Sequence, residues 1–208
     1  MKVNSDVVPS IKLFADNEQQ EAAIESALTK ILSKPTGNGL LRAIQSSSTN
    51  EKNITIVAYE KRGSSSAAIL TQSQITKLGG GPKEGFNKWS NQQAAELSTH
   101  RLLGGKGEGV SAYVYWNQNE SIKINDKKET YRSHDPEDAF LTLGHELIHA
   151  FYILNGQRLS KPLDPEGTRI HEEERAMGVG QFSNAKYSEN ALRKEHGRPL
   201  RKEYYSIN

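Results

Sequence analysis

The spacing of apolar and polar residues along the chain predicts a mixture of helices and strands. Apolar residues recur every three or four positions at residues 16–33, which indicates an amphipathic helix. Residues 53–59 (NITIVAY) are mostly β-branched or aromatic and predict a strand. Residues 110–116 (VSAYVYW) and 121–124 predict two further strands, which we expect to pair as a hairpin. Residues 61–66 are polar and glycine-containing, so we expect a turn or a mobile loop there.

The rest of the pattern predicts a single domain of the α+β class that follows a flexible leader. Charged residues and a proline interrupt the apolar positions of residues 1–15, so we expect a loosely ordered leader there. Such a leader could act as a secretion signal. Residues 16–208 are expected to form one domain. Within it, residues 35–39 (PTGNG) should end the first helix, and a short helix should follow at residues 40–44. Residues 79–109 are rich in glycine, asparagine and charge, which favours loops.

The stretch LGHELIHA carries the clearest chemical signal. His145 and His149 are four residues apart, so a helix places them on one face, one turn apart. Two neutral imidazoles at this spacing can reach one Zn²⁺ at the short Zn–N distance of about 2.0–2.1 Å. Glu146 follows the first histidine and would take a proton from a water molecule beside the metal. Residues 135–138 supply an N-cap, a proline and first-turn acids, and residues 155–156 supply a stop. A core helix with two hydrogen-bonded histidines is the alternative interpretation.

A catalytic zinc site needs a third protein ligand in addition to two histidines. The chain has no cysteine, so the ligand must be a histidine or a carboxylate. We expect a carboxylate from residues 172–174, three consecutive glutamates in a helix that should start at His171. Acids at a helix N-terminus are also favoured by the helix dipole, which is the alternative explanation of this run. His171 itself is a weaker candidate, because two histidines and a glutamate suit peptide hydrolysis better. A last helix is expected at residues 188–196, with Ser188 as its N-cap and Gly197 as its stop.

Composition and charge argue against two classes of partner. The net charge is only +2, and acids alternate with the basic residues of the chain end at residues 193–202, so we expect no nucleic-acid partner. No apolar run approaches the roughly 18 residues of a membrane span, and residues 1–15 lack the hydrophobic region of a signal peptide. We therefore expect no membrane partner, and we expect a monomer.

Several motifs resemble those of known proteases. The histidine stretch followed by EExRxxG at residues 172–178 is similar to the light chains of clostridial neurotoxins, in which the second glutamate of the pair binds zinc. The full set of motifs resembles more closely the NleD-type zinc protease effectors. The resemblance runs from about residue 36 to residue 204 and is most specific in the last third. The motifs that carry it are LLR at residues 40–42, KGEG at residues 106–109, HELIHA, EExRAxG, and ENALRxEHG at residues 189–197.

This resemblance implies a zincin-like α+β fold with a small β-sheet and roles that spacing alone leaves open. It implies that Glu173 is the third zinc ligand, beside the two histidines, and that Glu172 supports the site. In the neurotoxin light chains an Arg-x-x-Tyr pair stabilises the oxyanion, and Arg201-x-x-Tyr204 resembles that pair. An ordinary basic and aromatic chain end is the alternative interpretation of these two residues.

The resemblance also implies a function. Bacteria deliver NleD-type effectors through type III secretion into plant or animal cells, which predicts a zinc endopeptidase in the host cytoplasm. The implied substrates are stress-activated MAP kinases of the JNK type. We expect the host protein to bind as an extended segment that adds to the edge of the hairpin at residues 110–124.

Two other functions remain as alternatives. The first is a catalytically silent effector that keeps the zinc and only binds a host protein. Binding alone needs no general base, so the intact Glu146 argues against this alternative. The second is a housekeeping peptidase for short peptides, which the missing signal-peptide region and the resemblance to effectors both disfavour.

Overall fold

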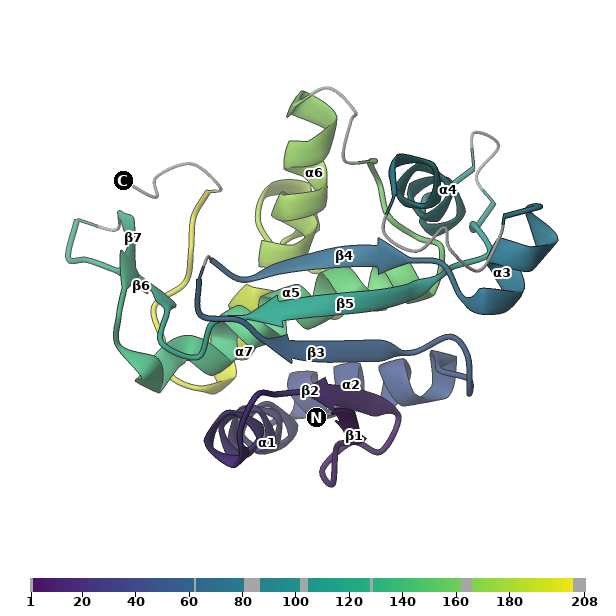
Figure 1. Cartoon of the computed structure of the whole chain (residues 1–208). Helices are drawn as coiled ribbons and strands as arrows, with labels where there is room; N and C mark the ends of the chain where they lie inside the picture. Colours follow the sequence, from purple (N-terminus) through teal and green to yellow (C-terminus); the bar gives the residue numbers. More distant parts are fainter. Residues whose placement is uncertain are drawn as a thin grey trace.

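A mixed five-stranded sheet is the framework of the molecule, seen face-on in Figure 1. The computed structural model describes residues 2–61, 63–80, 87–101, 105–127, 129–161 and 166–203. The strands of the main sheet, in spatial order, are β1 (Lys2–Asn4), β2 (Ile11–Phe14), β3 (Ile54–Ala58), β5 (Ser111–Trp116) and β4 (Ser65–Ile69). The inner strands β2, β3 and β5 are parallel, whereas β1 and β4 run antiparallel to their neighbours. A separate antiparallel pair consists of β6 (Ser121–Ile124) and β7 (Thr130–Ser133).

Helices cover one face of the main sheet. Figure 1 shows α1, α2, α5 and α7 behind the sheet, and α5 contacts β5 and β4 directly. The α-helices are α1 (Glu18–Leu32), α2 (Pro35–Ser47), α3 (Gln72–Lys77), α4 (Lys88–Ser98), α5 (Ala139–Leu154), α6 (Glu166–Met177) and α7 (Glu189–Glu195). Two short 3₁₀ helices are η1 (Pro136–Asp138) and η2 (Gly180–Phe182). This architecture confirms the α+β class that the sequence predicts.

The core lies between the sheet and the central helix α5. Residues alternate along each strand, so Ile54, Ile56 and Val114 point to the helices and are fully buried. Most residues of α5 are buried, which fits a helix that is apolar nearly all round. Each large apolar side chain buried here stabilises the fold by roughly 1.5–3 kcal/mol. The helix that carries the two histidines is therefore held rigidly from several sides.

The expectation of a loosely ordered leader at residues 1–15 is wrong for the part that the structure describes. Residues 2–4 and 11–14 form β1 and β2, and Ile11 and Leu13 are fully buried. Strand β2 pairs in parallel with β3, so its partner lies about forty residues further along the chain. The pattern IKLF is only four residues long and directly follows Pro9 and Ser10, so apolar spacing alone gives a weak strand signal there.

The first helix ends at Leu32, as predicted to within a few residues, but the segment expected to end it belongs to the next helix. Residues 35–39 do not form a loop; they begin α2, with Pro35 in the first turn, where its missing N–H costs nothing. Gly37 is needed for packing rather than for a turn. A Cβ atom at this position would lie 1.9 Å from the carbonyl oxygen of Ile31, so the glycine lets α2 approach the end of α1.

The predicted hairpin at residues 110–124 does not form, although both of its strands exist. β5 lies between β3 and β4, and β6 pairs with β7 instead. The expected loop at residues 61–66 enters β4 at Ser65, and α3 and α4 interrupt the segment expected to form loops. Four of the five residues of strand β4 (SSAAI) are small and have weak β preference, so its pairing with β5 is what makes it a strand.

Other local predictions are confirmed. Asp135 caps η1 through the backbone N–H of Glu137, Ser188 caps α7, and the glycine after α7 has a positive φ of 66°. The helix predicted from residue 171 begins earlier, at Glu166, so the three glutamates lie in its middle and not at its N-terminus. No helix in the described part of the chain is long and apolar enough to cross a membrane.

Candidate active site

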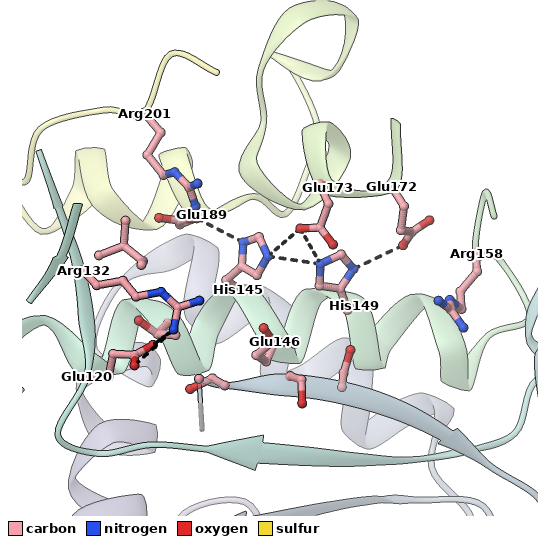
Figure 2. A pocket seen from close by; sticks show the side chains of 16 residues that line it. Glu120, Arg132, His145, Glu146, His149, Arg158, Glu172, Glu173, Glu189 and Arg201 are labelled. Atoms are coloured by element: carbon pink, nitrogen blue, oxygen red, sulfur yellow. Dashed lines mark hydrogen bonds and ion pairs between the residues drawn. The ribbon is translucent and has the colours of Figure 1, made fainter. Parts of the chain in front are cut away.

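Three side chains from two helices converge on one point above α5. His145 and His149 project from α5, and Glu173 projects from α6 towards both of them (Figure 2). The Nε2 atoms of the two histidines are 3.1 Å apart. The Oε2 atom of Glu173 lies 3.2 Å from Nε2 of His145 and 3.4 Å from Nε2 of His149. The structure therefore brings together the three residues predicted to hold the metal.

The spacing of these atoms fits a tetrahedral zinc ion. Donor atoms about 2.0–2.1 Å from a tetrahedral Zn²⁺ lie about 3.3–3.4 Å from one another, close to the three observed distances. A hydrogen bond between the two Nε2 atoms needs one proton, and the shared carboxylate oxygen faces both of them. A cation in the middle satisfies all three atoms together. Two imidazoles and one carboxylate are also a donor set that zinc prefers.

Glu189 orients the first histidine from the opposite side of its ring. Its Oε2 atom lies 3.0 Å from Nδ1 of His145, which leaves Nε2 facing the metal position. The approach of α7 depends on Gly144, because a Cβ atom there would lie 2.5 Å from Leu192 of α7. Glu189 is itself held by two guanidinium groups: Arg193 donates to it at 2.6 Å and Arg201 at 2.9 Å. All three side chains are almost completely buried.

Glu172 has the matching role for the second histidine. Its Oε1 atom lies 3.4 Å from Nδ1 of His149, and its Oε2 atom accepts the backbone N–H of Leu159 at 2.7 Å. Arg175 donates to both carboxylate oxygens, at 2.9 and 2.7 Å, and its guanidinium lies over the ring of Tyr152. Burial raises the pKa of Glu172, but His149 and Arg175 outweigh burial and lower the pKa to about 2. Glu172 is therefore ionised and positioned, as a supporting role requires.

The electrostatic balance of the site favours a bound cation. Burial lowers the pKa of His145, but Glu173 and Glu189 outweigh it and raise the pKa to about 9 in the metal-free chain. Burial also lowers the pKa of His149, but the neighbouring carboxylates, chiefly Glu173, outweigh burial and raise that pKa well above its usual value. Glu172 and Glu189 are each paired with guanidinium groups, whereas the polar contacts of Glu173 in the described part of the chain are with the two imidazoles alone. With both histidines neutral, a divalent cation at this point would compensate the negative charge of Glu173.

Glu146 lies between the histidine pair and strand β4 (Figure 2). Burial is the largest influence on its carboxyl group and raises the pKa above its usual range, against the opposing effects of the two histidines and of a hydrogen bond with Ser66. A raised pKa suits a carboxylate that must accept a proton and pass it on near neutral pH. The residue is thus placed for the general-base role predicted from the sequence, and no metal contact is needed for that role.

The two residues predicted near the chain end have different outcomes. Arg201 lies in the pocket that contains the histidine pair, and it is buried against Glu189. Tyr204 lies outside the described residues. The residue spacing in the sequence identified neither Glu189 nor the two arginines, Arg193 and Arg201, that hold it. A usable signal was present, because Glu189 and Arg193 are four residues apart on α7, the spacing of a helical ion pair.

Metalloproteases of the zincin type combine a histidine pair on one helix with a third protein ligand from elsewhere in the chain. The geometry above is of that kind. The chain belongs to the peptidase M91 family, which is described as effector protein, and the family model matches residues 11–204. Membership confirms the resemblance to effector proteases. The chain thus belongs to a family of effector proteins that carries a peptidase name, and His145, His149 and Glu173 form a group that could hold a metal ion.

Solved structures support the fold. The catalytic domain of Clostridium botulinum neurotoxin serotype F is 14% identical over 82% of this chain and 47% of that one, with a TM-score of 0.47. The light chain of botulinum neurotoxin type G is 12% identical over 94% of this chain and 74% of that one, with a TM-score of 0.50. The chain thus spans about half the length of the serotype F domain. The type G similarity confirms the zincin-like α+β fold, and the comparison with curated proteins found no match.

Proposed function

We propose that the protein is a zinc-dependent endopeptidase that cleaves a signalling protein of a host cell. The main support is a single arrangement: His145, His149 and Glu173 present three donor atoms at tetrahedral spacing, with the buried carboxylate of Glu146 beside them. A chain that only bound a partner would need no buried general base. This observation favours a protease over a catalytically silent effector.

The chemistry requires a metal, a base and a positioned peptide. A Zn²⁺ ion held by His145, His149 and Glu173 would polarise a water molecule and the scissile carbonyl. Glu146 accepts one proton as the water oxygen attacks the carbonyl carbon, and it returns that proton to the leaving amine when the C–N bond breaks. The products are a carboxylate end and an amine end. Glu189 and Glu172 hold the two imidazole rings in orientation throughout.

The edge of β4 is a better docking site for an extended substrate than the predicted hairpin at residues 110–124. β5 has no free edge, because it pairs with β3 and β4. In the described part of the chain β4 pairs with β5 alone, and Ser66 of β4 lines the pocket and hydrogen-bonds with Glu146. A peptide added to this edge would cross the site in extended form.

Arg201 is proposed to contribute to the oxyanion site together with Tyr204. Arg201 uses one terminal nitrogen for Glu189, and its buried Nε atom has no hydrogen-bond partner among the described residues. A buried donor without a partner is costly, and a substrate oxygen in the pocket would satisfy it. The same arginine therefore links the orientation of His145 to the charge that develops on the substrate.

The place of action and the substrate extend the family assignment. We propose delivery by type III secretion into the host cytoplasm, with stress-activated MAP kinases of the JNK type as the substrate class, as the resemblance to NleD-type effectors implies. A monomer would suffice, because every group named above comes from one chain. Neither a nucleic acid nor a membrane takes part in this proposal.

One experiment tests the proposal directly. The zinc-loaded chain is incubated with a lysate of host cells, and new peptide termini are mapped by mass spectrometry, with purified JNK as a second substrate. Two controls are Glu146→Gln and the parent treated with a chelator, the latter with and without added Zn²⁺. New termini that disappear in both controls and return with Zn²⁺ support the protease. A zinc-loaded parent that produces no new termini overturns it, and cleavage of other proteins but not JNK overturns only the substrate class.

A further inference from the structure

We propose that an aromatic shelf on the uncovered face of the sheet selects the substrate side chains that point away from the metal. The shelf consists of Tyr113 and Tyr115 of β5 and of Ser65 and Ala67 of β4. It would accept large apolar or aromatic side chains at two positions of the substrate, two residues apart. This inference rests on the proposed function, since it concerns the peptide that pairs with β4.

The alternation of β4 sorts its residues between the two faces. Ser66 points to the helix side, where its hydroxyl hydrogen-bonds with the carboxyl group of Glu146, and Ala68 packs against the core. Ser65 and Ala67 therefore point to the opposite face. A peptide strand beside β4 must alternate in the same way, so every second side chain of the substrate lies away from the metal.

Strand pairing places a tyrosine directly beyond each of these small residues. Ser65 is the partner of Tyr115, and Ala67 is the partner of Tyr113, so each pair shares one face of the sheet. An added strand would lie about 4.8 Å from β4 and about 9.6 Å from β5. The side chains of Ser65 and Ala67, which lie between the added strand and the tyrosines, are only a hydroxymethyl and a methyl group. A large substrate side chain can therefore lie over β4 and contact a tyrosine ring.

The tyrosines form a continuous surface that the helices do not cover. The rings of Tyr113 and Tyr115 are 6.2 Å apart, and Tyr59 extends the group at 5.6 Å from Tyr115, all in edge-to-face geometry. Both rings of β5 are partly exposed. Figure 1 views the sheet from this side, and no helix of the described part of the chain lies in front of β3, β5 and β4. Partly exposed tyrosines on a rigid sheet are typical of surfaces that bind protein segments.

The chemistry of the shelf determines what it would select. The residues of β4 and β5 that lie on the same face as the shelf are all uncharged. A charged substrate side chain placed there would lose hydration without gaining an ionic partner on these two strands. Leucine, methionine, phenylalanine and tyrosine would gain contact area against the rings. Selection by alternate positions predicts a spacing in the substrate that a single deep pocket would not produce.

The test is cleavage-site profiling with a proteome-derived peptide library. The zinc-loaded parent is compared with Tyr113→Ala, which removes one wall, and with Ala67→Gln, which fills the shelf while keeping the edge of β4. Phe14→Ala is the matched control, because it removes an exposed aromatic ring from the same face, three strands away from the free edge of β4. Melting temperature and zinc content are measured for every variant.

The parent should enrich large apolar residues at two positions that are two residues apart. Tyr113→Ala and Ala67→Gln should each reduce the enrichment at one of these positions by about five- to tenfold. Phe14→Ala should leave the profile unchanged. A parent that cleaves the library without this alternate preference, or a preference that both shelf variants retain, overturns the shelf but leaves the protease intact. A zinc-loaded parent that cleaves no peptide overturns both proposals.

Discussion

Replacing Glu189 with glutamine tests whether the metal site depends on the residue that spacing missed. The change keeps the shape of the side chain and removes its charge. Glu189 accepts hydrogen bonds from Arg193, Arg201 and His145 at 2.6, 2.9 and 3.0 Å. A glutamine can accept from one side only, so its amide NH₂ group must face another donor.

The expected magnitude follows from the burial of this network. The Glu189 side chain is 3% exposed, and those of Arg193 and Arg201 are 2% and 5% exposed. Removing one partner of a buried ion pair costs about 3–5 kcal/mol, because the remaining charge stays buried without compensation. Loss of the partner of a ligating histidine lowers metal affinity by about 10–100-fold. Glu189→Gln should therefore melt at a lower temperature and also bind zinc more weakly.

Two measurements separate these effects. Thermal unfolding of the metal-free chain reports the buried network, and competition with a chromophoric chelator at fixed pH reports the zinc Kd. Glu195→Gln is the matched control on the same helix. Its carboxylate accepts from the N–H and the hydroxyl of Thr36, away from the metal group, so it should lower stability by about 1 kcal/mol and leave zinc affinity unchanged. Parental zinc affinity in Glu189→Gln would refute the orienting role.

Further predictions concern the base, the third ligand, pH and the chain end. Glu146→Gln should retain zinc and fold but lose about 10²–10⁴ in kcat; activity near that of the parent would exclude the base role. Glu173→Ala should lose zinc affinity sharply while Glu174→Ala stays near the parent, and the reverse result in metal titrations would shift the ligand by one residue. The pKa of His145 is raised from 6.5 to about 9, so in the metal-free chain its protonated form adds stability below pH 6.5 that is lost as the pH rises to about 9. Zinc affinity should rise over that window, because the ligand must lose its proton, and a flat Kd would contradict the site. Tyr204→Phe should lower kcat by about 10²–10³ with KM nearly unchanged, whereas the same change at the next residue should have little effect; equal losses in steady-state kinetics would remove this residue from the mechanism.

The sequence by itself determined the parts of the protein that depend on local spacing. In a helix, a four-residue interval places His145 and His149 on one face, independently of the tertiary structure. The caps of α7 and the strands β3 and β5 also follow from neighbouring residues. The choice of the metal ligand among the three glutamates of residues 172–174 depends on both the sequence and the tertiary structure. Spacing leaves it open, family resemblance favours Glu173, and the structure places that residue beside both histidines.

Only the tertiary structure decided the contacts between distant segments. Glu189 meets His145 across 44 residues, and this contact depends on a glycine of α5 that lets α7 approach. β4 is a strand because β5 pairs with it. Since β5 lies between β3 and β4 instead of forming a hairpin with β6, β4 is the last strand of the sheet among the described residues and lies beside the pocket. Residues 11–14 belong to the sheet because β3 offers them a parallel partner. Non-local pairing and close packing depend on the whole chain, so neither apolar spacing nor local propensity carries that information.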